Sequence, residues 1–176
     1  MLILQGGQAL SSFRIQSLIS RANAAGIALE NLTCTYLFFI TGVVHDSAKL
    51  EQLLDASLLS VGPGFVVLPR SGTTSPWSSK ATEIAKNCGF EIVKRIERGM
   101  HIVVEGQVSA ADQILLNRLL ADPMMEDVLD GLPTEAFFTP GQPQPLSIVT
   151  LGVDPISALN GANHAHGLAL SDDEID

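Results

Sequence analysis

The 176-residue sequence has few of the residues and motifs that build catalytic, cofactor or metal sites. Its two cysteines, Cys34 and Cys88, are too few for a disulfide framework or a cysteine-based metal site. There is no phosphate-binding loop ending in Gly-Lys-Ser/Thr, no Gly-x-Gly-x-x-Gly and no His-Glu-x-x-His. The residues therefore predict no catalytic, cofactor-binding or metal-binding group, and we expect both cysteines to be free thiols.

Positive charge and long apolar runs are also scarce. Ten Lys and Arg face 19 Asp and Glu, a net charge of -9, which argues against a general nucleic-acid binder because phosphate neutralisation needs surplus cations. No apolar run approaches the roughly 20 residues that cross a bilayer. The first residues have no basic segment followed by a long apolar one, so we expect no signal peptide there. We expect neither nucleic acid nor membrane as a partner, and a cytoplasmic location.

The basic residues that are present are concentrated in one segment. Residues 70–98 hold six of the ten and carry a net charge of +3. Such a run is most often a solvated face. The alternative is a docking surface for an acidic domain or for a phosphorylated metabolite.

The apolar pattern predicts an α+β fold. In the first half we expect a strand at 1–5, a helix from Ser11 or Ser12 to about Ala25, a strand at 32–40 and a helix from Asp46 or Ser47. The first helix should bury one stripe of side chains: Phe13, Ile15, Leu18, Ile19 and Ala22.

The second half has a fuller pattern. It predicts a strand at 65–68, a helix at 78–88 capped by Ser78, and strands at 90–97 and 100–105 joined by a turn at Arg98-Gly99. A helix at 109–121 and a last strand near 135–138 complete a βαββαβ order, the ferredoxin-like arrangement. The first half looks like an abbreviated copy, so the two could join across their sheets as a pseudo-dimer.

Prolines mark a domain boundary. Residues 139–145 include Pro140, Pro143 and Pro145, a linker composition that separates a domain at 1–138 from residues 146–176. Beyond it we expect a strand at 146–151 and a helix from Asp154-Pro155 towards Leu170. A capping box, Ser171 with Glu174, then begins another helix. We interpret 146–176 as the truncated start of a helical linker domain.

The stretch from Phe65 to Gly89 carries a family resemblance. The run Ser75 to Thr82, with Pro69-Arg70 and Gly72-Thr73 before it, resembles the N-terminal domain of large, single-chain phosphoribosylformylglycinamidine (FGAM) synthase. The family often has Pro and Ile where Ser71 and Thr74 stand here. Further matching positions are Asn87-Cys88-Gly89, Arg95, Glu97-Arg98-Gly99, Met124-Met125-Glu126 and the C-terminal Gly167 to Leu170 and Asp173 to Asp176.

The resemblance implies a role without chemistry of its own. FGAM synthase is the glutamine- and ATP-dependent ligase of purine biosynthesis, and its N-terminal domain is similar to a dimer of the small accessory subunit of split versions of the enzyme. The ATP and magnesium sites and the glutaminase nucleophile lie downstream in the family enzyme, so this chain alone should be inactive. Its expected partners are the synthetase and glutaminase domains, which it would help to assemble for ammonia transfer.

Within that role, the loop and helix start at 70–80 are the predicted contact. Arg70 and Lys80 could pair with acidic groups of another domain, and Trp77 could be an interface anchor or could cover the domain's own core. Direct binding of a substrate phosphate by Gly72, Thr73 and Ser78 is a further alternative. The competing function is a free-standing small-metabolite binding or regulatory module with a ferredoxin-like fold.

Overall fold

The computed structural model describes residues 1–109, 112–141, 145–146 and 148–175. The chain divides into two compact units, Met1–Gly141 and Gln142–Asp176, and each is described by itself.

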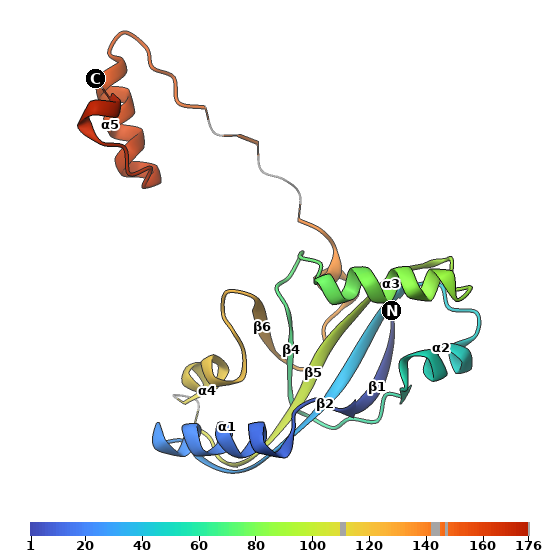
Figure 1. Ribbon diagram of the computed structural model, residues 1–176. Coiled ribbons are helices and arrows are strands. Elements are labelled where there is room, and N and C mark those ends of the chain that lie inside the picture. Colours follow the sequence, from blue (N-terminus) through green and yellow to red (C-terminus); the bar gives the residue numbers. More distant parts are fainter. Residues whose placement is uncertain (110–111, 142–144, 147, 176) are drawn as a thin grey trace. The chain divides into compact units, whose positions relative to one another are not determined.

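Unit 1 is built on one six-stranded sheet in which every neighbouring pair of strands is antiparallel (Figure 1). The strand order is β3-β1-β2-β5-β4-β6. The strands are β1 (Leu2–Gln8), β2 (Ala28–Gly42), β3 (Ser57–Leu58), β4 (Phe65–Pro69), β5 (Val93–Gln107) and β6 (Glu126–Asp130). With the helices that accompany this sheet, the expected α+β class is confirmed.

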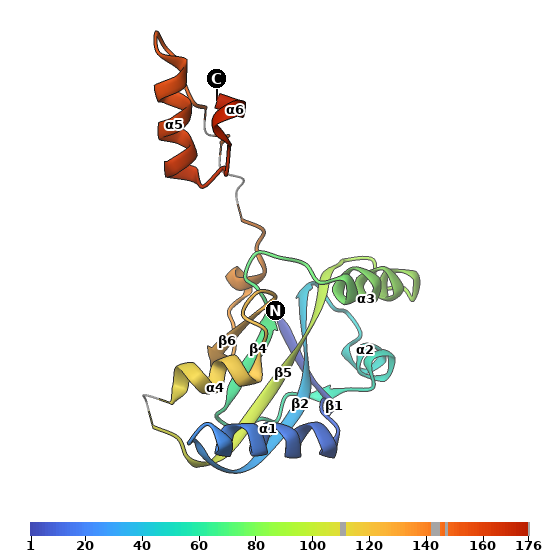
Figure 2. The ribbon, with the colours of Figure 1, turned by 60° about the vertical axis from the view of Figure 1, so that its left-hand side comes forward.

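Four helices form two separate groups against the sheet (Figure 2). They are α1 (Ser12–Ala24), α2 (Ser47–Leu54), α3 (Pro76–Asn87) and α4 (Gln113–Leu120). Helices α1 and α4 share one core cluster with Leu32 and Cys34 of β2. Helices α2 and α3 share another with Phe38 and Ile40 of the same strand. Because side chains two apart in a strand face the same side, both helix groups cover one face of the sheet and leave its centre between them.

The opposite face is buried by other segments. Leu37 and Phe39 of β2 point to it and pack with Val66 and Leu68 of β4. A short 3₁₀ helix, η1 (Glu135–Phe138), supplies Phe138, whose ring centroid lies 5.4 Å from that of Phe39. The two faces therefore have separate cores, one covered by the four α-helices and the other covered in part by η1.

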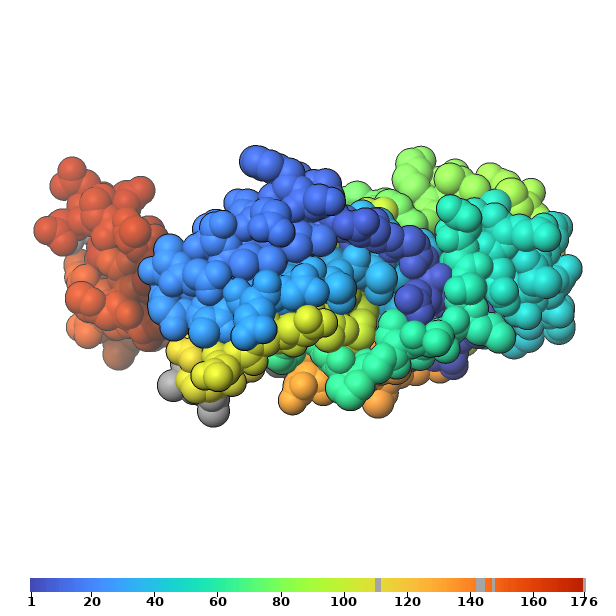
Figure 3. All heavy atoms as spheres, turned by 90° about the horizontal axis from the view of Figure 1, so that it is seen from below, coloured from blue at the N-terminus to red at the C-terminus, as the bar shows by residue number. Residues whose placement is uncertain are grey.

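Strands β2 and β5 are 15 residues each and pair along nearly their whole length. Figure 3 shows one end of this pair, where the start of β2 (blue) lies against the end of β5 (yellow-green). The register slips once near each end, beside Gly42 opposite Val93 and beside Gly106 opposite Leu29. Both glycines have positive φ, +99° and +142°, which side-chain-bearing residues rarely adopt.

The two halves of unit 1 repeat the same order of elements. Each half has the order β-α-β-α-β, so β1, β2 and β3 correspond to β4, β5 and β6. With this correspondence, the strand order is the same when it is followed from either edge of the sheet. The helix ends correspond as well: Ile27 N–H donates to Ala22 O and Phe90 N–H to Ala85 O, both at 3.0 Å. The second half thus has five elements in place of the predicted βαββαβ.

The hairpin predicted at Arg98-Gly99 is wrong, because β5 runs through both residues without a turn. A Cβ added at Gly99 would lie 2.5 Å from Leu68 Cδ2 and 2.8 Å from Val67 O. Glycine at this position therefore allows β4 to approach closely, which is the other common reason for glycine inside a strand.

Several burial and boundary predictions were also wrong. The last strand lies at Glu126–Asp130, and residues 135–138 form the 3₁₀ helix instead. Phe13 is 82% exposed although it was placed in the buried stripe of α1. In α4, Leu116 and Leu120 are buried while Ile114 is exposed. The expected start of that helix at 109 runs into residues 110–111, which lie outside the described residues.

The predicted helix starts fare better. Ser11 caps α1 and accepts from Arg14 N–H at 3.4 Å, and Asp46 caps α2 and accepts from Lys49 N–H at 2.9 Å. Gly89, with φ of +96°, follows the C-cap of α3.

Unit 2 contains α5 (Pro155–His166) and α6 (Asp172–Ile175). Asp154 caps α5 through Ser157 N–H at 3.1 Å. Gly167 ends the helix in the left-handed conformation, three residues before the expected end near Leu170. The Ser171 N–H and hydroxyl both donate to Glu174 Oε2 at 2.9 Å, which forms the glutamate half of the predicted capping box. The strand predicted at 146–151 is wrong for the described part of that segment, which has no strand.

Candidate functional site

The candidate loop leads directly into the N-terminus of α3. The N-cap is Ser75, not Ser78 as predicted, and Ser75 Oγ accepts from Ser78 N–H at 3.0 Å. Pro76 occupies the first helical position, where its missing N–H costs nothing. Ser78 lies inside the first turn and is fully buried, and its hydroxyl has no partner among the described residues.

Replacing each serine by alanine tests whether Ser75 or Ser78 is the N-cap of α3. We expect Ser75→Ala to lower the free energy of unfolding by about 1–2 kcal/mol, because a helix N–H loses its acceptor. We expect Ser78→Ala to leave it unchanged or to raise it, because a buried hydroxyl without a partner is removed. Urea denaturation followed by tryptophan fluorescence measures both. A larger loss for Ser78→Ala would restore Ser78 as the cap.

The loop between β4 and α3 is held by backbone hydrogen bonds to distant segments. Arg70 N–H donates to Met125 O at 3.1 Å, Ser71 N–H to Asp127 Oδ2 at 2.9 Å and Gly72 N–H to Phe137 O at 3.2 Å. Thr73 N–H donates to Arg70 O at 3.0 Å. The N–H groups of Gly72, Thr73 and Ser78 are thus already bonded within the chain, and they are not free to cradle a phosphate.

A buried ion pair fixes the other end of the loop. Arg95 Nη2 lies 2.6 Å from Glu97 Oε2, with 13% and 1% of the two side chains exposed. Glu97 also accepts from Ser75 Oγ at 2.6 Å and from Ser75 N–H at 3.3 Å. Arg95 donates in addition to Thr73 O at 2.6 Å and Phe138 O at 3.1 Å. The pair therefore connects β5, the loop and η1 in one network.

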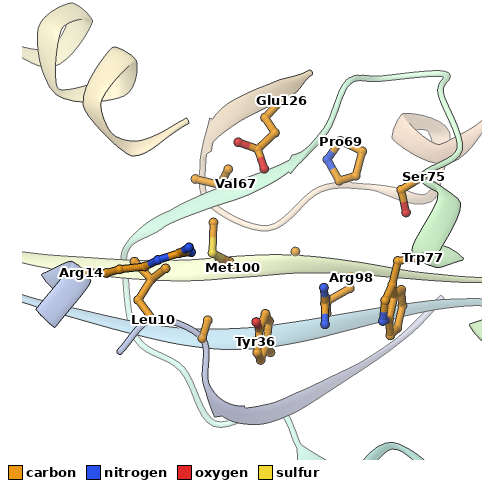
Figure 4. A pocket seen from close by; sticks show the side chains of 12 residues that line it. Leu10, Arg14, Tyr36, Val67, Pro69, Ser75, Trp77, Arg98, Met100 and Glu126 are labelled. Carbon is orange, nitrogen blue, oxygen red and sulfur yellow. The ribbon is translucent and has the colours of Figure 1, made fainter. Parts of the chain in front are cut away.

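Trp77 lies half-buried beside the loop, at the centre of the helix-covered face. Its ring centroid is 5.7 Å from that of Phe38, and the Arg98 guanidinium carbon is 4.7 Å from it. Trp77, Arg98 and Ser75 line a cavity of about 280 Å³ that continues to Tyr36 and Met100 (Figure 4). Both interpretations of Trp77, covering the domain's own core and contacting a partner, are compatible with this position.

The structure separates the six predicted contact residues. Arg70, Thr73 and Lys80 are exposed, Gly72 and Trp77 are half-buried, and Ser78 is fully buried. Lys80 pairs with Glu83 on the surface of α3 at 3.2 Å. Only Arg70, Thr73, Trp77 and Lys80 therefore have a side chain that another molecule could reach, while Gly72 and Ser78 support the loop from within.

Sequence reasoning missed Arg95, Glu97 and Arg98 as members of the site. The sequence pattern predicted a strand end at residues 95 and 97 and a turn at Arg98. At such positions a charged side chain can point into solvent and needs no partner. Read as one strand, residues 95 and 97 share one face and residue 98 points to the other. That alternation is the signal which would have placed the ion pair on one side and Arg98 beside Trp77.

Chemistry-bearing groups are few elsewhere in the described residues. No group of three or more His, Cys, Asp or Glu side chains lies close enough there to hold a metal ion. Burial raises the pKa of the Cys34 thiol to about 12, so it stays protonated and unreactive at neutral pH. No helix within the described ranges is long and apolar enough to cross a membrane.

A comparison with protein families finds a match over the part of the chain that contains the candidate loop. Residues 40–138 match the family described as the formylglycinamide ribonucleotide amidotransferase N-terminal region, a span that covers more than half of the chain. This span runs from the end of β2 through the candidate loop, β5 and η1. The chain therefore belongs to the family of N-terminal regions of formylglycinamide ribonucleotide amidotransferase, that is, FGAM synthase.

Proposed function

We propose that the chain is a non-catalytic interdomain module of FGAM synthase. In this proposal it packs against the synthetase and glutaminase domains in the cytoplasm and helps to enclose the route of ammonia from glutamine to the phosphorylated amide. Enclosure matters because ammonia released to water is protonated and diluted before it can act as a nucleophile. ATP and magnesium would be bound by those other domains.

The observation that carries the proposal is the family match over residues 40–138, which includes the whole candidate loop. The hydrogen bonds of the loop support it, because a loop fixed by Met125, Asp127 and Phe137 loses little entropy on docking. Arg70 and Lys80 remain exposed there as cations for an acidic partner.

The repeated β-α-β-α-β order supports a finer proposal about architecture. We infer that the two halves of unit 1 correspond to two copies of an accessory-subunit-like unit, joined through β2 and β5 as a pseudo-dimer. Two matched features favour it: the sheet order is symmetric about the β2–β5 pair, and Gly42 and Gly106 occupy corresponding register slips.

Reconstitution tests the role. The chain is mixed with the separately expressed remainder of an FGAM synthase of this family, and FGAM formation is followed with glutamine and then with ammonia. We expect glutamine-dependent activity to return only on mixing. A defect confined to glutamine assigns the module to ammonia transfer. Full activity of the remainder alone with both nitrogen sources would refute the proposal.

Trp77→Ala should weaken association with that remainder by roughly tenfold or more, because a partly buried Trp is typical of interface hot spots. Titration calorimetry measures the affinity, and circular dichroism of the isolated chain shows whether it stays folded. Ile114→Ala, which removes an exposed apolar side chain from α4, is the control and should leave the affinity unchanged. Unfolding of the isolated Trp77→Ala chain would instead identify Trp77 as part of the core.

A further inference from the structure

The cavity beside Trp77 lies at a gap in the core of unit 1. The α1–α4 group and the α2–α3 group cover the two ends of one sheet face and form separate clusters. Met100 packs against the first cluster, and Tyr36 and Trp77 pack against the second. The centre of the face is left with a hollow of about 280 Å³, a size that suits a small metabolite or a single acidic group.

Arg98 projects into this hollow, and its guanidinium has no acceptor among the described residues. Its Cζ lies 4.6 Å from the Tyr36 ring centroid and 4.7 Å from that of Trp77. These rings fix the position of the guanidinium and contribute about 0.5–2 kcal/mol each, but they accept none of its N–H groups in the plane. Among the described residues no oxygen accepts a hydrogen bond from the Arg98 side chain.

Arg95 has the hydrogen-bond acceptors that Arg98 lacks. Arg95, three residues earlier on the same strand, donates to Glu97, to Thr73 O and to Phe138 O. No nitrogen of Arg98 is among the buried atoms without a partner, so its N–H groups remain open to solvent. Arg98 therefore presents donors that a ligand can use.

The remaining charges around the hollow favour an anion. Arg14 of α1 also lines it, and Glu126 of β6 is the single acidic group there. Figure 4 shows Arg14 of α1 and Arg98 of β5 at separate places along the hollow, with Glu126 on another side. Glu126 Oε2 accepts from Asp122 N–H at 3.1 Å, so it is held by its own loop and forms no ion pair with Arg98.

We propose that this hollow binds a small oxyanion, a carboxylate or phosphate group, through the guanidinium of Arg98, with Arg14 adding to the positive potential. Guanidinium groups form paired, charge-assisted hydrogen bonds with two oxygens of either group. The apolar remainder of such a ligand would lie against Val67 and Met100. This inference concerns the isolated chain and does not rest on the interdomain role.

The test uses Trp77, the only tryptophan, as the reporter within the site. The full chain is titrated separately with inorganic phosphate and with glutarate, and potassium chloride at equal ionic strength is the control. We expect a saturable fluorescence change with at least one probe, with a dissociation constant on the order of 1 mM. The probe that binds distinguishes phosphate from carboxylate chemistry.

Arg98→Met should weaken this binding by roughly tenfold or more, because the two charge-assisted hydrogen bonds are lost. Arg118→Met on α4 changes the net charge equally outside the hollow and should have no effect. Should Arg98→Met fail to fold, Arg14→Met on the exposed side of α1 should weaken binding by about threefold, as expected for loss of a nearby partly screened charge. Calorimetry checks that the fluorescence reports binding.

Two results would overturn the proposal. One is the absence of a saturable response to either probe up to about 50 mM, where even a very weak site of under 2 kcal/mol would be occupied. The other is binding that Arg98→Met and Arg14→Met leave as strong as in the unchanged chain.

Discussion

Glu97→Ala should lower the free energy of unfolding of unit 1 by about 3–5 kcal/mol, because it leaves a buried guanidinium without its carboxylate. Arg95 is only 13% exposed, and its Nη2 lies 2.6 Å from Glu97 Oε2. The change also removes the acceptor for the Ser75 hydroxyl and N–H, so the cap of α3 loses its support. Urea denaturation followed by Trp77 fluorescence measures the loss.

Glu83→Ala is the matched control for that experiment. Glu83 also pairs with a cation, Lys80, at 3.2 Å, but the two side chains are 63% and 78% exposed. An exposed pair of this kind contributes less than about 0.5 kcal/mol. Similar losses for the two variants would mean that the Arg95–Glu97 pair does not stabilise the loop.

Gly42→Ala should destabilise unit 1 by about 3 kcal/mol, the sum of an unfavourable backbone conformation and a steric clash. Gly42 has φ of +99°, and a Cβ there would lie 2.5 Å from Ile92 O and 2.7 Å from Lys94 N. Lys94 N belongs to the paired strand β5 and Ile92 O lies just before it, and such backbone atoms cannot move aside as a flexible side chain would. Thermal and urea unfolding measure the change.

Gly7→Ala provides the comparison for Gly42→Ala. Gly7 lies in β1, its φ is not positive and nothing lies within 4 Å of an added Cβ. Its replacement should change the free energy of unfolding by less than about 0.5 kcal/mol. Gly106→Ala, at the corresponding slip near the other end of the β2–β5 pair, should behave like Gly42→Ala. A tolerated alanine at both slips would show that the two ends can adjust their register.

The sequence determined the local features whose causes are local. Ser11, Asp46 and Asp154 start helices as predicted, because a capping side chain bonds to an N–H three residues away. Gly89 follows the end of α3 because glycine adopts positive φ readily. The specific run from Ser75 to Thr82 carried the family resemblance, which the match over residues 40–138 confirms.

Tertiary structure decided the features whose causes lie far along the chain. Glycine is typical of turns, but Gly99 lies inside strand β5, where Leu68 and Val67 of β4 approach it closely. Ser75, two positions before Trp77, became the cap of α3 with support from Glu97, 22 residues away. The approach of β4 to Gly99 and the hydrogen bonds from Ser75 to Glu97 cannot be read from neighbouring residues, because the segments involved meet only in the folded sheet.

In the candidate site, too, the sequence predicted some features and only the tertiary structure decided others. The sequence identified the loop and its exposed cations, Arg70 and Lys80, from residue types and the family pattern. The structure alone paired Arg95 with Glu97 on one face of β5 and left Arg98 against Tyr36 and Trp77 on the other. The physical reason is the two-residue period of a strand: once β5 was seen to be continuous, its charged side chains had to alternate between two different environments.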